Sequence, residues 1–594
     1  MRDTDPIHTP APSRRHFLVH TSSTAAALAV SGTLVACGDD NPEPAEFKYG
    51  VASGDPLATS VILWTHAKIA GSTRNVGLTW QLASDASFAT LLKSGRVEAT
   101  EASNFTTKVD VTGLTAGNSY FYRFVDDAGV TSTVGSTRTL PASAATSVKL
   151  AVFSCALYSE GYFNTYDAAA KSDAQYAIHL GDYLYEYGSD PKKFGNTDAV
   201  ALGRVTSPAN DIVSLGDYRT RFALYRADPN LQALHAKMPM IAVWDDHEFA
   251  NNAWVGGAEN HNPATQGDWA TRKSNAARAY HEWMPIRTPD ASNLLKIYRR
   301  FDFGNLLSLH MLDTRIEGRD QQYDNFGDAD GGLGRYIAGL TPNAGGVLPD
   351  TSRKMVSTTQ QSWLANGMAA STATWQFLGN QDIMARMWFP ASVLQAQAAA
   401  ASNPAAVPTA INAYLTAKAT RAAGAPLNPT QTALLSASTN PRLPYNLDSW
   451  DGYPAQREAV LQTAKAQGKK LVALSGDSHN AWFANLTTLA GDKVGVEFAT
   501  SSVTAPGFES AGLGALASSL DGSVLGASAV GAGLGLIDDL LYADTIRRGY
   551  LLVTVTAAAV KGEFVFMSTV KSTTYSATVG KTITVAANGT VAYA

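Results

Sequence analysis

Four short apolar runs lie far apart along the chain, and each leads into polar residues. They belong to the segments KLAVFSC (149–155), QYAIHLGDYLYEY (175–187), MIAVWDDHEFANN (240–252) and KKLVALSGDSHNAW (469–482). Runs of this kind, bounded by turn residues, are typical of strands buried on both faces. In open α/β proteins the functional groups gather at the carboxyl ends of such strands. The pattern therefore predicts an α/β fold with a site where these segments end.

The polar residues that close the four segments are of the types that bind metal ions. They carry a thiol, carboxylates, a phenol, an amide and imidazoles, on Cys155, Asp182, Tyr185, Asp246, His247, Asn252, Asp477 and His479. A single strand end with Asp or His would carry little weight. Four such ends together indicate a metal-dependent hydrolase.

Hydrolysis of a phosphate ester needs two things that metal ions supply. A hydroxide must exist near neutral pH, and the negative charge on the phosphoryl oxygens must be stabilised. Two or more cations held ~3.5–4 Å apart do both. Asp182 is the candidate bridging ligand, because each of its two oxygens can bind a cation. Gly181, directly before it, removes side-chain bulk at the strand end.

The candidate ligands other than Asp182 favour an iron ion next to a second, divalent ion that prefers oxygen ligands. We expect Tyr185 to lie on the same side as the bridging carboxylate, three residues earlier, in a first helical turn. A phenolate together with the thiolate of Cys155 favours Fe(III) over zinc, which more often uses several Cys and His. Oxygen ligands from Asp246, Asn252 and Asp477 suit Ca(II) or Mg(II).

His247 is the candidate proton donor. It follows Asp246, and a His beside a metal ligand can stabilise the phosphoryl group or protonate the leaving alkoxide. Glu248 is a candidate for orienting it. We therefore predict His247, Glu248 and Asp246 as catalytic residues. The alternative is that His247 and Glu248 only fix the local structure.

The first residues have the pattern of an export signal. Residues 13–18 (SRRHFL) form a twin-arginine motif, and a short apolar, Ala-rich stretch follows over 24–36. Its length favours a removed signal over a membrane span. Residues 34–37 resemble a lipobox, in which Cys37 would carry a lipid anchor. The alternatives are a chance Arg-Arg pair, or an incidental Cys37 with cleavage to a soluble protein.

The rest of the chain divides by its patterns. We predict a signal peptide over 1–37, a linker over 38–47, a β-sandwich domain over 48–141, an α/β domain over 148–570 and a β-hairpin over 571–594. The β domain resembles a fibronectin type III module, in which Leu114 and Tyr120 would form a tyrosine corner.

Two segments interrupt the alternation of strands and helices in the predicted α/β domain. Residues 392–440 are rich in Ala and Pro, which predicts short helices and loops inserted near the site. Residues 506–541 are rich in Gly, Ala and Leu. That composition predicts either a mobile apolar lid over a lipid-like substrate or a packed helical excursion.

Composition adds limits rather than a function. The 594 residues allow two or three domains, and 45% hydrophobic with 16% charged residues is ordinary for a globular protein. A net charge of −5 argues against a nucleic-acid binder, which needs a basic face. The chain has only two cysteines, Cys37 and Cys155. If Cys37 is lipidated or removed, Cys155 has no disulfide partner. Cys155 would then be either a buried apolar residue or a metal ligand.

The chain resembles the PhoD-type alkaline phosphatase and phosphodiesterase family in a set of motifs that occur in one order. Besides the twin-arginine signal and Cys155, they are FKYGVASGD (47–55), LWT (63–65), GYF (161–163), GDYLYEY (181–187), WDDHEFANN (244–252), GDWATRKSNAARAYHEWMP (267–285), FGNLLSLHMLDTR (303–315), QQSWL (360–364), DSWDGYPAQR (448–457), GDSHNAW (476–482) and VEFATSSVTAPG (496–507). The motifs cover the chain from residue 47 to about 556, except the Ala-rich insertion and residues 508–541.

This resemblance implies a four-layer αββα metallophosphoesterase core behind an N-terminal all-β domain. It implies Fe(III) held by Cys155, Asp182, Tyr185 and His479, and Ca(II) held by Asp182, Asn252 and Asp477. The role of Asp246, and the choice between Asn251 and Asn252, stay open.

The implied function is an exported phosphoesterase, an alkaline phosphatase or phosphodiesterase that releases phosphate with a metal-activated hydroxide. Its partners would be small-molecule or polymer phosphate esters and the twin-arginine export machinery. Its location would be periplasmic, or membrane-anchored through the lipid on Cys37. The alternatives are a phospholipase D-like phosphodiesterase and a non-catalytic surface lipoprotein.

Overall fold

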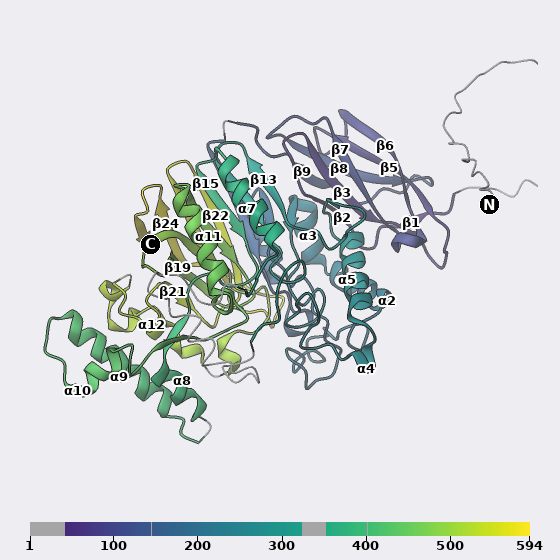
Figure 1. Cartoon of the computed structure of the whole chain (residues 1–594). Helices are drawn as coiled ribbons and strands as arrows, with labels where there is room; N and C mark the ends of the chain where they lie inside the picture. The colour runs from purple at the N-terminus through teal and green to yellow at the C-terminus, as the bar shows by residue number, and fades with distance from the viewer. Residues whose placement is uncertain are drawn as a thin grey trace, which may run out of the picture. The chain divides into compact units, whose positions relative to one another are not determined.

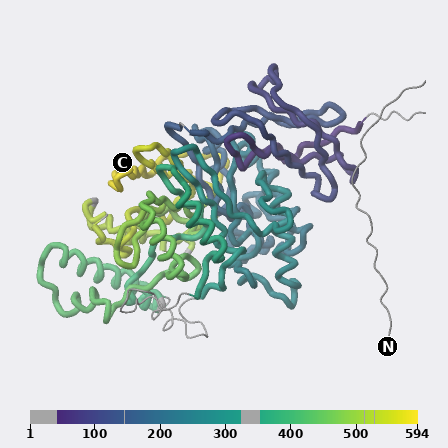
Figure 2. The backbone as a smooth tube through the Cα atoms, turned by 45° about the horizontal axis from the view of Figure 1, so that its top comes forward, coloured from purple at the N-terminus to yellow at the C-terminus, as the bar shows by residue number. Residues whose placement is uncertain are grey.

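The computed structural model describes residues 42–143, 145–323, 352–400, 402–511, 513–530 and 532–593. The predicted signal peptide, including Cys37, lies outside these residues. Within them, no helix is both long and apolar enough to cross a membrane. Two large sheets, each with a block of parallel strands, organise the chain that follows (Figures 1 and 2).

The larger sheet carries three of the four apolar runs as neighbours. Its strands are, in spatial order, β25 (Val591–Tyr593), β24 (Ala577–Ala586), β23 (Ala559–Met567), β22 (Gly549–Thr556), β10 (Ser147–Phe153), β11 (Tyr176–His179), β12 (Met240–Ala242), β2 (Val51–Gly54), β3 (Ser60–His66) and β7 (Thr106–Thr112). β10, β11 and β12 are parallel, so their carboxyl ends meet at one edge. β24 and β25 form the expected terminal hairpin, which extends this sheet through β23.

The second sheet carries the fourth run. Its order is β13 (Arg299–Phe303), β14 (Leu307–Met311), β15 (Trp375–Gly379), β18 (Lys470–Ser475), β20 (Lys493–Ala499), β19 (Ala481–Thr487) and β21 (Leu540–Asp544). β14, β15, β18 and β20 are parallel.

Side chains of β18 show how this sheet is buried on both faces. Val472 and Leu474 belong to the core shared with the ten-stranded sheet. Leu471 and Ala473 point the other way, into a second core that includes Leu461 and other helical residues. This period of two is what a strand buried on both faces requires.

Helices cover the outer faces of the two sheets, which gives the four layers αββα. Those that pack on the ten-stranded sheet are α1 (Asn164–Ala170), α2 (Leu215–Arg226), α3 (Pro229–Lys237) and α5 (Trp269–Trp283). Those on the seven-stranded sheet are α7 (Thr358–Ala370) and α11 (Pro454–Ala466), which run beside each other (Figure 1). Short polar residues start several of them, as N-caps do: Ser214 forms a capping box with Asp217 at α2, and Asp268 caps α5. The predicted fold class is therefore confirmed.

The N-terminal strands form a sandwich that is not separate from the core. Its second sheet has the order β6 (Leu91–Ala99), β5 (Val76–Ala83), β8 (Ser119–Asp126) and β9 (Gly135–Arg138). It packs on β3 through an apolar cluster that includes Leu63 and Leu78. The Tyr120 hydroxyl accepts a hydrogen bond from the Thr115 amide at 2.9 Å and donates one to its carbonyl at 3.2 Å, as in a tyrosine corner.

The first sheet of this sandwich continues into the α/β core, which the sequence did not predict. β2 pairs with β12 through Gly54 and Met240, and the Asp55 amide donates to the Met240 carbonyl at 3.0 Å. A Cβ on Gly54 would lie 2.2 Å from the Pro285 carbonyl and 2.5 Å from that of Met240. Glycine therefore permits the close approach that joins the two parts.

The two irregular segments differ from their predictions in detail. The Ala-rich insertion contains α8 (Ala391–Ala398), α9 (Ala406–Ala422) and α10 (Pro429–Leu435), which lie apart from the sheets (Figures 1 and 2). α9 is not short, because Pro408 falls in its first turn, where proline is tolerated. The segment 506–541 has no long helix: α12 (Ala517–Leu520) is its one α-helix among the described residues. Its apolar side chains are nevertheless packed, with Leu520, Leu536 and Ile537 buried.

Candidate metal centre

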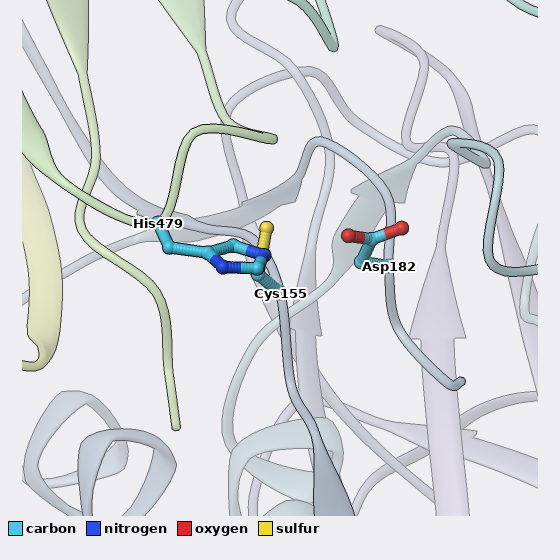
Figure 3. A group of neighbouring side chains, drawn as sticks. All are labelled: Cys155, Asp182 and His479. Atoms are coloured by element: carbon cyan, nitrogen blue, oxygen red, sulfur yellow. The ribbon is translucent and has the colours of Figure 1, made fainter. Parts of the chain in front are cut away.

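The predicted ligands follow the carboxyl ends of four strands. Cys155 lies two residues after β10, Asp182 three after β11, and Asp477 two after β18. The loop after β12 supplies Asp245, Asp246 and His247. Figure 3 shows Cys155, Asp182 and His479 gathered from three of these loops. The fold thus brings together groups that are more than 300 residues apart in the sequence.

The backbone at these positions is strained in a way that ordinary loops avoid. Nine non-glycine residues of the described chain have a positive φ, and five of them are predicted ligands: Cys155 (60°), Asp182 (53°), Asn252 (51°), Asp477 (54°) and His479 (62°). Non-glycine residues rarely adopt this region, and they persist there only where the surroundings impose it, often at functional sites.

Gly181 shows what such a tight loop demands. Its φ is 111°, and a Cβ there would lie 2.4 Å from the Cβ of Asp245 in the neighbouring loop. Only glycine meets both conditions. The sequence expectation that Gly181 removes bulk before Asp182 therefore has a specific physical reason.

Cys155, Asp182 and His479 form the first donor group. The thiol sulfur, one carboxylate oxygen and one imidazole nitrogen lie within 4.8 Å of one another (Figure 3). The Tyr185 hydroxyl joins them, 3.0 Å from Asp182 Oδ2 and 3.1 Å from His479 Nε2. Tyr185 reaches this place from a non-helical loop. The predicted helical turn is therefore wrong, because the left-handed backbone at Asp182 excludes a helix there.

Hydrogen bonding prepares His479 for a ligand role. Its Nδ1 lies 2.7 Å from the Pro506 carbonyl oxygen, so Nδ1 is the donor and Nε2 carries the lone pair that faces Tyr185. Burial lowers the pKa of His479 to about 4, which keeps the imidazole neutral. A ring nitrogen fixed by a backbone carbonyl is the usual partner of a metal-binding one.

Asp182 and Asp246 also lie together with His247, again within 4.8 Å, and form a second group in which the two carboxylates are the candidate metal ligands. Asp182 belongs to both groups, which is the position of a bridging ligand. The carboxylate of Asp246 is held by two backbone amides, from His247 at 2.9 Å and from Asn252 at 2.5 Å. The neighbouring amide of Asn251 is engaged elsewhere, since its Oδ1 accepts from the Tyr187 hydroxyl at 3.2 Å. Both side chains also donate through Nδ2 to Glu259, at 3.0 Å from Asn251 and at 2.6 Å from Asn252, so the choice between them stays a prediction.

Glu186, rather than Glu248, orients His247. Glu186 Oε2 lies 2.7 Å from His247 Nδ1, and both side chains are buried. Burial opposes the charge on His247, but the carboxylates of Asp246, Asp182 and Glu186 outweigh it and raise its pKa well above the usual value.

Glu248 instead ties two of the loops together. Its carboxylate accepts from the amides of Asp182 at 3.0 Å, Tyr183 at 2.5 Å and Asp245 at 2.7 Å. The prediction that Glu248 orients the histidine is corrected, because its oxygens are occupied by the backbone of the loops after β11 and β12. Glu248 thus serves the site by fixing the positions of Asp182 and Asp245.

A buried arginine completes the surroundings of the donors. Arg315 has a fully buried side chain, and its guanidinium contacts Asp245 at 2.5 Å, Asp448 at 2.7 Å and Asp477 at 2.8 Å. Arg319 contacts Asp448 from the other side. These cations balance a further acidic group, Asp382 with Asp448 and Asp477, that would otherwise be an additional candidate cation site.

Sequence reasoning missed Glu186, Asp245 and Arg315, although signals existed. Glu186 lies within the same tyrosine-rich loop as Tyr185, and Asp245 precedes Asp246 directly. Arg315 follows the apolar run of β14, as the ligands follow theirs. An ionic residue just beyond a buried strand is the common feature.

The donor set fits metal ions. Burial, with the neighbouring negative charges, raises the pKa of both Asp182 and Asp477 well above the usual range. A bound cation would offset that charge and keep these carboxylates ionised. Sulfur, phenol, imidazole and carboxylate suit a trivalent or borderline ion, and the oxygen donors around Asp246 suit a harder one.

Comparisons with known proteins agree with this geometry. Residues 150–564 match the family model of PhoD-like phosphatases, and residues 32–141 match the model of the N-terminal domain of PhoD-like phosphatases. Alkaline phosphatase D of Bacillus subtilis (strain 168) is 32% identical over 480 residues, which are 78% of this chain and 70% of that protein.

A solved structure of PhoD has the same architecture. It superposes with a TM-score of 0.71 at 27% identity, over 94% of this chain and 93% of the other. The strand-end donors, the αββα layers and these matches lead to one conclusion: the chain belongs to the PhoD-like phosphatase family and is a phosphoric ester hydrolase.

Proposed function

We propose that the chain is an exported, metal-dependent phosphoesterase that hydrolyses organic phosphate esters. The observation that carries the metal dependence is the shared position of Asp182 in two donor groups, each within 4.8 Å. Cys155, Tyr185 and His479 would complete an Fe(III) site. Asn252 and Asp477 would provide the Ca(II) site together with Asp182. Asp246 lies close to both Asn252 and Asp477. When bound, the ions supply the positive charge that stabilises the phosphoryl oxygens and acidify the attacking water.

The protein's own residues would handle the remaining proton. Glu186 holds His247 through Nδ1 at 2.7 Å, which leaves Nε2 for the substrate. The raised pKa of His247 keeps a proton available for the leaving alkoxide. Arg315, through Asp477 at 2.8 Å, and Glu248, through the loop amides, would keep the ligands in place. Glu186, Arg315 and Glu248 would thus hold other side chains and loops in position, and His247 would donate the proton.

The first experiment is elemental analysis of the exported protein together with its visible absorption spectrum and its phosphate release. We expect iron and calcium near stoichiometric amounts, a tyrosinate-to-iron absorption band, and hydrolysis of phosphate esters. Cys155→Ala should lose iron, the band and activity. An active, iron-free Cys155→Ala protein would refute the proposed iron site, and zinc as the resident metal would refute the assignment to iron.

Export and anchoring form a separate part of the proposal. They are supported by Arg14 and Arg15, by the apolar stretch that follows them, and by the lipobox-like residues before Cys37. Replacing both arginines with Lys should keep the precursor inside the cell, and Cys37→Ala should release the mature protein from the membrane fraction. Export of the Lys variant at the normal level would refute the twin-arginine route.

A further inference from the structure

One exposed aromatic side chain lies directly on the candidate metal centre. Phe194, in the loop that follows Tyr187, is 39% exposed. Its ring is stacked on the imidazole of His479, with the ring centroids 6.0 Å apart and the planes at 21°. Single exposed hydrophobic side chains are common on protein surfaces. Phe194 differs from most of them because it packs on a predicted metal ligand while part of its ring stays open to solvent.

Tyr187 extends this aromatic surface from His479 towards His247. The rings of Phe194 and Tyr187 meet edge to face, with their centroids 6.4 Å apart. The Tyr187 ring in turn lies 5.3 Å from the imidazole of His247. The Tyr187 hydroxyl is held in place, since it donates to Asn251 Oδ1 at 3.2 Å. The two rings therefore form an aromatic rim, Tyr187 with Phe194, that runs from a predicted metal ligand to the predicted proton donor.

The loop that carries Phe194 is fastened next to the ring. The side chain of Asn196 is buried and donates through Nδ2 to the Gly188 carbonyl at 2.7 Å, which closes the loop on itself. Gly195 has a φ of 72°, and a Cβ there would lie 2.1 Å from Leu157 Cδ2. These contacts hold the loop against the strand end that supplies Cys155. Phe194 is thus presented in a fixed position, as a residue that contacts a ligand should be.

The aromatic rim borders the place from which the alcohol of a bound ester departs. In the proposed function the phosphate binds at the donor groups around Asp182, and His247 gives its proton to the leaving oxygen. That oxygen then lies at His247, and the organic group attached to it points away from the attacking water, because the displacement is in line. Since the rim begins at His247 and continues to the exposed ring of Phe194, the organic group lies beside the rim.

We propose that Phe194 and Tyr187 bind the organic group of the ester, so that esters with a flat aromatic ring in this group are preferred substrates. The inference rests on the proposed function, because it places the phosphate at the donor groups. An aromatic ring stacked on the exposed part of Phe194 buries apolar surface and also gains the favourable geometry of a ring pair. An aliphatic ring of the same size gains only the burial, and a methyl group gains little of either.

The test compares benzyl, cyclohexylmethyl and methyl phosphate on the metal-loaded enzyme. Benzyl and cyclohexylmethyl alcohol are both primary alcohols with a six-membered ring, so the main difference between their esters is the flatness of the ring. We expect kcat/KM to be up to about tenfold higher for the benzyl ester, which corresponds to about 1.4 kcal/mol. The difference should lie in KM, because the ring is bound equally before and during the reaction. Equal values for the two esters would overturn the proposal.

Substitutions at one position locate the preference. Phe194→Ala and Phe194→Leu should abolish the preference for benzyl over cyclohexylmethyl phosphate, whereas Phe194→Tyr, which keeps a ring, should retain it. Phe121→Ala is the matched control and should also retain it, because Phe121 is a half-buried phenylalanine in β8 of the four-stranded sheet. An unchanged preference in the Ala and Leu variants would overturn the proposal. So would an equal loss of activity towards all three esters with loss of bound iron, since Phe194 would then only support His479.

Binding of non-hydrolysable phosphonates separates this proposal from the proposed function. Calorimetry with benzyl, cyclohexylmethyl and methyl phosphonate should give the lowest Kd for the benzyl compound, and Phe194→Ala should remove that advantage. If no ester is hydrolysed but this trend is present, the hydrolase proposal fails and the aromatic rim proposal holds. If esters are hydrolysed and the benzyl compound has no advantage in Kd or KM, the aromatic rim proposal fails alone.

Discussion

Replacement of Arg315 by Met tests how the centre holds its charges. The Arg315 guanidinium lies in a fully buried place and contacts four carboxylates: Asp245 at 2.5 Å, Asp448 at 2.7 Å, Asp477 at 2.8 Å and Asp382 at 3.0 Å. Met has a similar length and no charge. The change therefore leaves the shape of the site nearly intact and removes its central cation.

The expected cost follows from the burial of these groups. Removing one partner of a buried ion pair costs about 3–5 kcal/mol, because the other partner is left as an uncompensated buried charge. Arg315 has four such partners, but some of them will bind protons once the cation is gone, which limits the loss. We expect Arg315→Met to lower the free energy of unfolding by about 3–5 kcal/mol.

Urea denaturation measures this difference, with both proteins freed of metal by a chelator so that lost metal binding does not contribute. Arg96→Met is the matched control, since Arg96 pairs with Asp127 on the surface at 2.6 Å. An exposed pair of that kind contributes at most about 1 kcal/mol. If Arg315→Met costs no more than Arg96→Met, the reasoning is refuted.

A second readout uses the acids that the variant would free. Asp382, Asp448 and Asp477 lie within 4.8 Å of one another. Without Arg315 they form an oxygen-rich group suited to calcium. Calcium should therefore stabilise Arg315→Met, in a concentration-dependent way, by more than it stabilises the unchanged protein through the proposed calcium site at Asp182, Asn252 and Asp477. Equal stabilisation of both proteins would show that the arginine does not occupy the place of a cation.

Three further predictions follow from other contacts. Glu186→Gln should lower the pKa of His247, because a negative charge 2.7 Å away is lost, so kcat should begin to fall at a lower pH on the alkaline side; an unchanged pH profile would remove Glu186 from the mechanism. Gly181→Ala should reduce bound metal severalfold by elemental analysis, since φ is 111° and the new Cβ would meet Asp245 at 2.4 Å; normal metal content would contradict this. Burial lowers the pKa of His310 to about 4, so its neutral form stabilises the fold above its usual pKa of about 6.5 and this contribution is lost as the pH falls from about 6.5 towards 4. Between pH 7 and pH 4.5, the free energy of unfolding should fall by up to about 3 kcal/mol less in His310→Gln than in the unchanged protein. An equal fall in both proteins, measured by denaturation at the two pH values, would disprove this.

Local sequence patterns were sufficient to predict the strands and most of the side chains that the fold gathers at the candidate site. Each apolar run is short and ends in ligand-type residues, so the strand and its functional end are read from one segment. Cys155, Asp182 and Asp477 could be identified in this way without knowing which sheet held them. Family membership then excludes the interpretation as a non-catalytic surface lipoprotein.

What the sequence did not reveal depends on contacts between distant residues. Glu186 meets His247 across 61 positions, and Arg315 meets Asp245 across 70, so neither pairing leaves a spacing pattern. The junction of β2 and β12 consists of one residue pair, Gly54 with Met240. The hydrophobic periodicity of the sequence cannot predict strand pairing that consists of a single residue pair.

The helical turn predicted for Tyr185 failed for a related reason. Side-chain spacing suggested a helix, but the left-handed backbone of Asp182 is imposed by the crowded loops around it. Tertiary packing, not local propensity, determines that conformation.

The pairing of β10 with β22 sets the order of events during synthesis of this protein. Ser147 lies opposite Thr556 and Val152 opposite Leu551, so the strand that leads to Cys155 has one edge open until the last part of the chain has been made. At roughly 5–20 residues per second, Gly549 follows Phe153 from the ribosome by about 20 s or more. The candidate metal centre therefore forms only after translation is nearly complete, and a truncated chain presents an exposed strand edge instead of a partly active enzyme.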